Sequence, residues 1–163
     1  MIFVTVGTQL PFDRLVRAVD AWAGEHPGQE VVIQTASGGR PPEHCQAHET
    51  LAPEAWRALF DRADLVVAHA GIGTILSCRE AGRRLIVVPR EAARGEHRND
   101  HQLATVASLG DLPGIRVITE VEDLPEAIEV ALSEPATGHS RESAELERLV
   151  GCLRRFALGE RDA

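Results

Sequence analysis

Two glycines separated by one residue follow a short apolar run in the middle of the sequence, and this pattern is typical of an anion-binding turn. Residues 65–68 are apolar, His69 follows them, and Gly71 and Gly73 come next. A helical spacing of apolar residues then runs to Gly82. A glycine backbone approaches a ligand where a Cβ would collide, and the unpaired amides of a first helical turn favour a phosphate. We therefore predict a strand, a phosphate-binding turn and a helix, while an ordinary strand-to-helix turn of a parallel sheet has the same spacing.

A second unit of strand, glycine turn and helix opens the sequence. Residues 2–6 are an apolar run, Gly7 and Thr8 follow it, and a helical pattern begins at Phe12 and Asp13. The amide of Gly7 and the hydroxyl of Thr8 are candidates to meet a second face of a diphosphate. The alternative is that Gly7 only makes the turn between the two elements.

Composition limits the classes of protein to which the chain can belong. Its 163 residues, 44% hydrophobic and 26% charged, suit one soluble domain with a real core. The net charge of −8 argues against sequence-independent binding of nucleic acid. Three cysteines are spaced for neither zinc nor a disulfide framework, which favours reduced thiols. Without a leader-like or membrane-spanning stretch, we expect a cytoplasmic chain that meets a membrane only through a partner.

Apolar runs alternate with helical patterns along the chain. We predict strands at 2–6, 31–33, 45–48 (a weak edge strand), 65–68, 85–88 and 115–118. Helices are predicted from Phe12, from Pro53 to before Asp64, from 75 to 81, from 99 to 109, over 124–132 and, as a long amphipathic helix, over 139–158. This order predicts a single α/β, Rossmann-like domain over 1–163, with a parallel sheet of about six strands and helices on both faces.

Parallel sheets of this kind bind ligands beyond the carboxyl ends of their strands, near the point where the strand order reverses. The turns at Gly7 and His69 and the charged loop over 90–102 all follow strands. We therefore expect three polar loops to meet at one edge of the sheet.

Five stretches, in order, resemble the C-terminal, donor-binding half of GT-B glycosyltransferases, the family 28 C-terminal domain. They are Val-Thr-Val-Gly-Thr-Gln at 4–9, His-Ala-Gly-Ile-Gly-Thr at 69–74, Glu-Ala-Gly at 80–82, Leu-Ile-Val-Val-Pro at 85–89 and Asn-Asp-His-Gln-Leu at 99–103. The resemblance covers roughly residues 1–135. The opening stretch is similar to stand-alone subunits of two-component enzymes, such as the UDP-N-acetylglucosamine transferase subunit of dolichol-linked glycan synthesis and bacterial exopolysaccharide transferases.

The resemblance implies inverting transfer from a UDP-sugar without a required metal or other cofactor. The sequence has no Asp-x-Asp pair of the kind that holds a metal against a diphosphate. The residues that would bind the UDP phosphates are Gly7, Thr8, Gln9, His69, Gly71, Ile72, Gly73 and Thr74. They would stabilise the charge of the departing UDP, and His69 is the one candidate catalytic residue among them.

The other donor contacts implied by the resemblance lie in three places. Sugar hydroxyls would meet Asn99, Asp100, His101 and Gln102, whose short polar side chains are otherwise ordinary helix caps. The uracil would lie along 85–90, with backbone groups of Val88 and Arg90 as contacts. Related families hold the ribose with a carboxylate at the position of Ser77; Glu80, on the same helix face, is the proposed substitute or a solvated acid.

The resemblance implies that the catalytic base comes from another component, because two-domain relatives tend to carry it on the acceptor-binding half. The implied partners are a membrane-associated, acceptor-binding subunit and a lipid-linked glycan acceptor. The helix over 139–158 is a candidate docking element, or it packs on its own sheet. Six arginines lie between Arg79 and Arg98. They could bind the diphosphate or face the partner, or they could form a surface stripe whose charge is balanced by Glu80, Glu91 and Glu96.

Two other functions compete with glycosyl transfer. A nucleotide-sugar-binding module without chemistry has the same sequence features. A GT-B epimerase is disfavoured because it needs both lobes in one chain. An NAD-binding domain is disfavoured because no Gly-x-Gly-x-x-Gly follows a strand with an acid about 20 residues on.

Overall fold

The computed structural model describes residues 1–99, 101–109 and 114–134. Its strands are β1 (Ile2–Thr5), β2 (Val31–Gln34), β3 (Gln46–His48), β4 (Leu65–His69), β5 (Arg84–Val88) and β6 (Ile115–Val117). Its α-helices are α1 (Asp13–Glu25), α2 (Pro53–Arg62), α3 (Ile72–Ala81), α4 (His101–Leu109) and α5 (Leu124–Ser133), with short 3₁₀ turns η1 (Ala92–Arg94) and η2 (Val121–Asp123). The predicted order of strands and helices is confirmed over these residues. The predicted helix over 139–158 lies outside them.

The six strands form one sheet in the order β3-β2-β1-β4-β5-β6, and every neighbouring pair is parallel. From β1 the chain adds β2 and β3 toward one edge of the sheet. It then crosses back to the other side of β1 and adds β4, β5 and β6 toward the opposite edge. The strand order therefore reverses between β1 and β4, which is where open α/β sheets bind their ligands. The predicted parallel sheet is confirmed.

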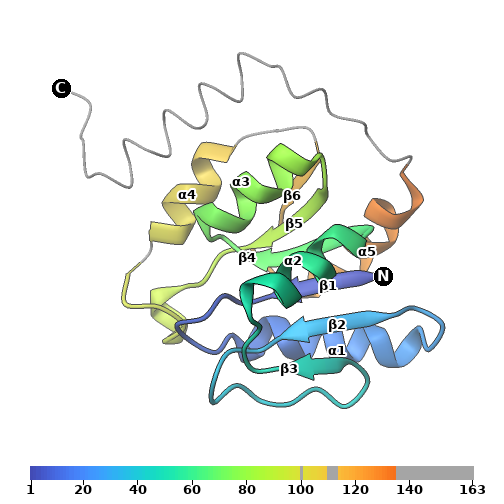
Figure 1. Cartoon of the computed structure of the whole chain (residues 1–163). Helices are drawn as coiled ribbons and strands as arrows, with labels where there is room; N and C mark the ends of the chain where they lie inside the picture. The colour runs from blue at the N-terminus through green and yellow to red at the C-terminus, as the bar shows by residue number, and fades with distance from the viewer. Residues whose placement is uncertain (100, 110–113, 135–163) are drawn as a thin grey trace.

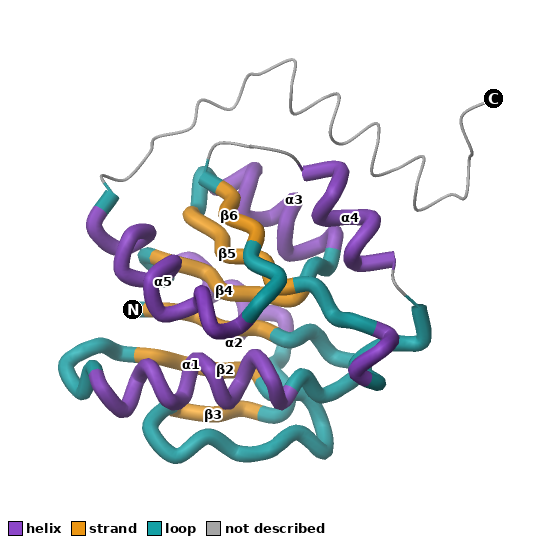
Figure 2. Tube along the Cα trace, turned by 180° about the vertical axis from the view of Figure 1, so that it is seen from behind, coloured by secondary structure: helices purple, strands orange, loops and turns teal. Residues whose placement is uncertain are grey.

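Helices cover both faces of the sheet, as the two views in Figures 1 and 2 show. Helices α1 and α5 pack on one face, against inward side chains such as Ile2, Val4 and Leu65. Helices α2, α3 and α4 pack on the other face, against Phe3 and Val66. Because successive strand residues point to opposite faces, a buried strand must be apolar at every position, as β1 is up to Val4.

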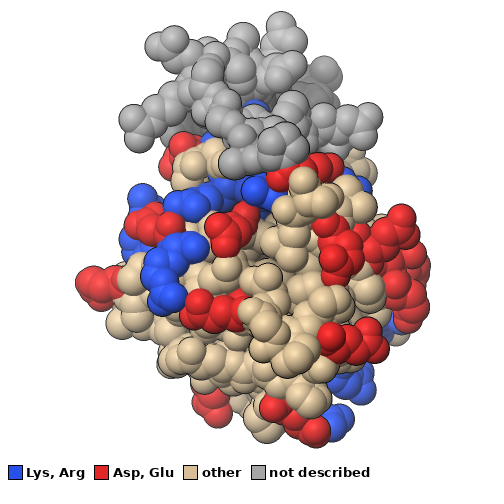
Figure 3. Space-filling view, turned by 90° about the vertical axis from the view of Figure 1, so that its right-hand side faces the viewer, with Lys and Arg blue, Asp and Glu red and all other residues tan. Residues whose placement is uncertain are grey.

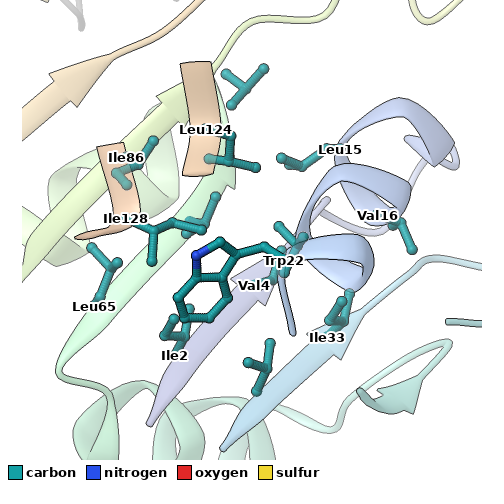
Figure 4. Packing of buried hydrophobic residues seen from close by; sticks show 14 of the residues in the cluster. Ile2, Val4, Leu15, Val16, Trp22, Ile33, Leu65, Ile86, Leu124 and Ile128 are labelled. Carbon is teal, nitrogen blue, oxygen red and sulfur yellow. The ribbon is translucent and has the colours of Figure 1, made fainter. Parts of the chain in front are cut away.

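Helix α1 covers much of the face of the sheet that carries Ile2 and Val4. Its buried residues are Leu15, Val16, Val19, Trp22 and Ala23, which form one apolar stripe. Figure 4 shows the indole of Trp22 among side chains of the sheet and of α5. The indole N–H donates to Glu129 Oε1 of α5 at 3.0 Å. Trp22 therefore fills the core and ties the two helices of this face together.

Helix α3 begins earlier than its apolar spacing predicts. The N–H of Ile75 donates to the carbonyl of Gly71 at 3.2 Å, so the helix starts at Ile72, within the glycine turn itself. It ends at Gly82, which adopts the left-handed conformation with φ 63°. The predicted end is confirmed, and the earlier start brings the first helical amides to the end of β4.

The opposite edge of the sheet, where the strands begin, carries charges of both signs (Figure 3). Arg83 donates there to the carbonyls of Ala63 and Asp61, at 2.7 and 2.5 Å. No α-helix in the described ranges is long and apolar enough to cross a membrane.

Candidate functional site

A cleft of about 290 Å³ opens at the carboxyl ends of β1, β4 and β5. Its walls come from three loops: Val6, Gly7, Thr8, Gln9 and Leu10 after β1; His69, Gly71, Gly73 and Thr74 after β4; and Arg90, His97 and Gln102 after β5. The loops expected to converge from the sequence therefore do so, at the point where the strand order reverses.

The imidazole of His69 lies between the backbones of two glycines. A Cβ added to Gly7 would lie 2.8 Å from His69 Cε1, and one added to Gly71 would overlap His69 Nε2. Gly7 also has φ +81°, a conformation that other residues rarely adopt. A Cβ at either glycine would thus crowd the imidazole, and at Gly7 the left-handed turn favours glycine as well, whereas Gly71 has an ordinary extended conformation.

Burial keeps His69 neutral at neutral pH. The pKa of His69 falls from 6.5 to about 4 because the imidazole is desolvated, and the nearby charge of Arg90 lowers it further. His69 Nδ1 is 3.5 Å from the carbonyl oxygen of Thr5, a weak contact that raises the pKa slightly. Since a carbonyl only accepts, this contact places the proton on Nδ1 and leaves a lone pair on Nε2.

The amino terminus of α3 presents unpaired donors to the cleft. Gly71 precedes the helix and gives it no side-chain cap, and no acid lies in the first turn. The N–H of Gly71 donates back to the carbonyl of His69 at 2.7 Å. Within the described ranges, the N–H groups of Ile72, Gly73 and Thr74 have no acceptor. A Cβ at Gly73 would meet nothing within 4 Å, so open space lies beside these donors.

The loop after β1 offers mainly side chains. Thr8 and Gln9 are exposed and line the cleft. The N–H of Gly7 already donates to Thr5 Oγ1 at 3.3 Å, and that hydroxyl donates to Gln34 Oε1 at 2.8 Å. The predicted phosphate contacts of this loop therefore rest more on Thr8 and Gln9 than on the Gly7 amide.

Arg90 is buried in the wall of the cleft, with 3% of its surface exposed. Its guanidinium donates to the carbonyls of Val6, Leu10, Pro11 and Glu96. Desolvation lowers the Arg90 pKa to about 10, so the side chain stays charged at neutral pH. Its backbone N–H, a predicted uracil contact, donates to Gln102 Oε1 at 3.1 Å.

Gln102 joins the ends of two strands. Its Oε1 accepts from the N–H of Ala70 at 3.2 Å and from that of Arg90 at 3.1 Å. Because the oxygen is committed to the backbone, the side-chain amide nitrogen is the group that remains to donate to a ligand.

The other predicted donor contacts take varied positions. Asn99 Oδ1 accepts from the N–H of His101 at 3.3 Å, as a helix cap does, and both side chains are exposed. Asp100 lies outside the described residues. Ser77 and Glu80 are on α3 but not among the residues that line the cleft, and Glu80 is exposed. Val88 is fully buried, so only its backbone can meet a ligand.

The charged loop after β5 is an ion-pair network. Arg14 pairs with Glu96 at 2.7 Å and with Glu91 at 3.3 Å. Arg94 pairs with Glu91 at 3.0 Å and with Glu120 at 3.3 Å. The balanced stripe expected from the sequence is thus present in part, while Arg90 is buried instead of on the surface. Sequence reasoning missed Arg14, because a partner 82 positions away leaves no local pattern.

Comparisons with known proteins agree with this fold. The sequence matches the model of the glycosyltransferase family 28 C-terminal domain over residues 1–151. No curated protein matches the chain.

Solved glycosyltransferase structures share the fold at low sequence identity. The NMR structure of ALG13 is similar with a TM-score of 0.63 and 19% identity, over 91% of this chain and 93% of that one. The kitacinnamycin glycotransferase is similar with a TM-score of 0.59 and 19% identity, over 98% of this chain and 40% of that one. MurG of Acinetobacter baumannii gives a TM-score of 0.59 and 16% identity, over 95% of this chain and 49% of that one. The chain therefore spans less than half of the length of the last two proteins.

Proposed function

Because the chain belongs to the glycosyltransferase family 28 C-terminal domain family, we propose that its cleft binds the nucleotide diphosphate of a UDP-sugar donor. The observation that carries the proposal is the uncapped start of α3. Three N–H groups without an acceptor in the described ranges, at Ile72, Gly73 and Thr74, meet the positive end of the helix dipole. The open space beside Gly73 admits an anion there.

These donors suit stabilisation of a leaving group. As the bond between the sugar and the diphosphate breaks, negative charge grows on the departing UDP. The helix holds the amides of α3 in place before the reaction, so they need no reorganisation, and the exposed side chains of Thr8 and Gln9 line the same cleft. We propose that they meet this charge without a metal ion, and that the neutral His69, whose Nε2 lone pair only accepts, meets a hydroxyl or N–H group of the donor and not a phosphate oxygen.

The remaining parts of the donor are assigned by their position. The amide nitrogen of Gln102 would donate to a sugar hydroxyl, with Asn99, Asp100 and His101 nearby. The backbone at Val88 and Arg90 would contact the uracil. Ser77 or Glu80 would hold the ribose, and the exposure of Glu80 leaves its carboxylate accessible.

Transfer would require a second component. Among the described residues, no carboxylate lines the cleft, so a base that accepts the proton of an acceptor hydroxyl is absent from its walls apart from histidine. We propose a two-component, inverting enzyme in which a membrane-associated, acceptor-binding subunit supplies this base and presents a lipid-linked glycan. The chain would act in the cytoplasm, at the inner face of the membrane, in keeping with the free thiols of Cys45 and Cys78.

The lack of a carboxylate in these walls also favours one alternative. A nucleotide-sugar-binding module without chemistry needs the phosphate donors and no base. Co-purification with the membrane partner, followed by an assay of sugar transfer to a lipid acceptor, separates the two. Turnover supports the enzyme, whereas UDP binding without turnover in the complex supports the module.

Isothermal titration tests the nucleotide class directly. UDP should bind to the chain, and NAD and ATP should not. Binding of NAD in place of UDP would exclude the proposed donor.

A further inference from the structure

We propose that Arg90 and Arg14 form a crossed clamp that sets the width of the cleft, with Arg90 positioning the loop that meets the second phosphate. The inference rests on the proposed function, because it assigns a role in binding the diphosphate. Neither guanidinium group needs to touch the ligand, and the proposed uracil contact of Arg90 is made by its backbone. The clamp is defined here as Arg90, Arg14, and the backbone carbonyls and the Glu96 carboxylate to which they donate.

Arg90 comes from the loop after β5 and reaches the loop after β1. Its NH2 donates to Val6 O at 2.8 Å and to Leu10 O at 2.6 Å, and its NH1 donates to Pro11 O at 2.5 Å. These carbonyls lie before and after Thr8 and Gln9 in the chain. The guanidinium therefore fixes both ends of the segment that carries the two cleft-lining side chains.

Arg14 makes the reciprocal connection. It lies in the first turn of α1, directly after the loop that Arg90 holds. Its Nε donates to Glu96 Oε1 at 2.7 Å and its NH2 donates to Pro89 O at 3.1 Å, both in the segment that carries Arg90. Each segment thus supplies an arginine that binds the other.

The sheet does not provide this connection. β1 and β5 are separated by β4, so no strand ladder joins the two loops. Both guanidinium groups lie over the ring of Phe12, with the Arg90 guanidinium carbon 4.6 Å and the Arg14 guanidinium carbon 5.3 Å from its centroid. The planar fork of arginine satisfies several carbonyls in a fixed geometry, which a lysine ammonium does not reproduce.

The contacts of Arg90 predict an effect on ligand affinity that differs from the effect of a general loss of stability. The guanidinium of Arg90 is committed to backbone carbonyls, so its loss would release the loop from Val6 to Pro11 while the α3 amides stay in place. Affinity should then fall for a ligand with a second phosphate more than for one with a single phosphate. A substitution that only weakened the fold would lower both affinities alike.

Arg90→Lys, Arg90→Met and Arg94→Met provide the test. Arg90→Lys keeps the charge and removes the fork. Arg94→Met is the matched control, because Arg94 is on the same segment but its side chain is 45% exposed and pairs with Glu91 and Glu120. Circular dichroism and thermal melting establish that each variant is folded at the temperature used. If Arg90→Met does not fold, Arg90→Lys carries the test.

Two readouts are measured on the whole chain. Hydrogen exchange of the amides in residues 6–10 reports on the loop without any ligand. Titration with UDP and with UMP gives the ratio of the two dissociation constants. We expect faster exchange in this loop and about a tenfold loss of UDP affinity in both Arg90 variants, with UMP affinity changed by less than about threefold. Arg94→Met should match the wild type in both readouts.

The outcomes distinguish the inference from the proposed function. Unchanged exchange in the loop, or equal loss of UDP and UMP affinity, would overturn the clamp. If the wild type bound no UDP, the proposed function would fail, and with it the role in diphosphate binding. Exchange would then still decide whether Arg90 holds the loop.

Discussion

At the scale of single residues, Gly71 and Gly73 have different surroundings, one packed against His69 and the other open. Gly71 leaves room for the imidazole, whereas Gly73, two residues on, faces open space. The sequence motif predicts a glycine turn, but it assigns the same role, close approach to a ligand, to both glycines. The difference depends on where the His69 ring lies, which follows from its contact with β1, 64 positions away. Local sequence therefore predicts the turn and leaves the role of each glycine undetermined.

Substitution of the two glycines by alanine should have opposite effects. Gly71→Ala places a methyl group against His69 Nε2 and should lower the free energy of unfolding by about 1–3 kcal/mol. Gly73→Ala meets no neighbour in a helical turn and should raise it by up to about 1 kcal/mol, while narrowing the proposed phosphate site and weakening UDP binding. Urea unfolding and titration with UDP measure the two effects. Equal destabilisation by both alanines would contradict the assignment.

The pKa of His69 predicts a loss of stability in mild acid. Its folded value of about 4 lies below the ordinary 6.5, so between these values the unfolded chain binds more protons. Stability should therefore fall as the pH is lowered from about 6.5 to 4, with His69 accounting for about 3 kcal/mol at most. His69→Asn removes this titration, so its free energy of unfolding should depend less steeply on pH over the same interval. Parallel curves for the two proteins would show that His69 is not buried in its neutral form.

At the scale of elements, the proposed binding of UDP depends on the start of α3. The helix has neither a capping side chain nor an acid in its first turn, although either would stabilise it. The periodicity of apolar residues predicts the helix and its end at Gly82, but places its start too late. The reason is that Ile72, Gly73 and Thr74 enter the helix through the backbone bond to Gly71, which has no signature in side-chain spacing.

A negative charge in this first turn should raise the stability of the fold and lower the affinity for UDP. Thr74→Glu should raise the free energy of unfolding by about 0.5 kcal/mol through the helix dipole and should weaken UDP binding at least about tenfold by repulsion. Thr74→Gln is the neutral control of similar size, and it should weaken UDP binding much less. Thermal melting and titration with UDP measure both properties. If the Glu and Gln variants bound UDP equally, no anion would lie at this helix end.

At the scale of the molecule, the described residues form an apolar core on each face of the sheet and a cleft at the carboxyl ends of its strands. The parallel sheet and its two helical layers were predictable, because alternating apolar strands and amphipathic helices allow few arrangements, whereas the order of the strands was not predicted. The walls of the cleft were predictable only as far as each loop follows a strand. The clamp was not, since Arg14 and Arg90 are joined to partners 82 and 84 positions away.

Two tryptophans on opposite faces of the sheet test whether packing of the core affects UDP binding in the cleft. Trp22→Phe removes the indole donor to Glu129 and should lower the free energy of unfolding by about 1 kcal/mol beyond the loss of ring area. Trp56→Phe is the matched control, because Trp56 packs on Phe60 by ring stacking at 5.0 Å. Urea unfolding should show the larger loss for Trp22→Phe, and both variants should bind UDP as the wild type does. A UDP affinity altered by either change would mean that core packing on that face controls the cleft.

A crystal structure of the chain with UDP is the most direct test of the account. Phosphate oxygens should lie within hydrogen-bond distance of the N–H groups of Gly73 and Thr74, with Thr8 and Gln9 on the other side of the diphosphate. A nucleotide bound away from the start of α3, with these amides still without a ligand, would contradict it.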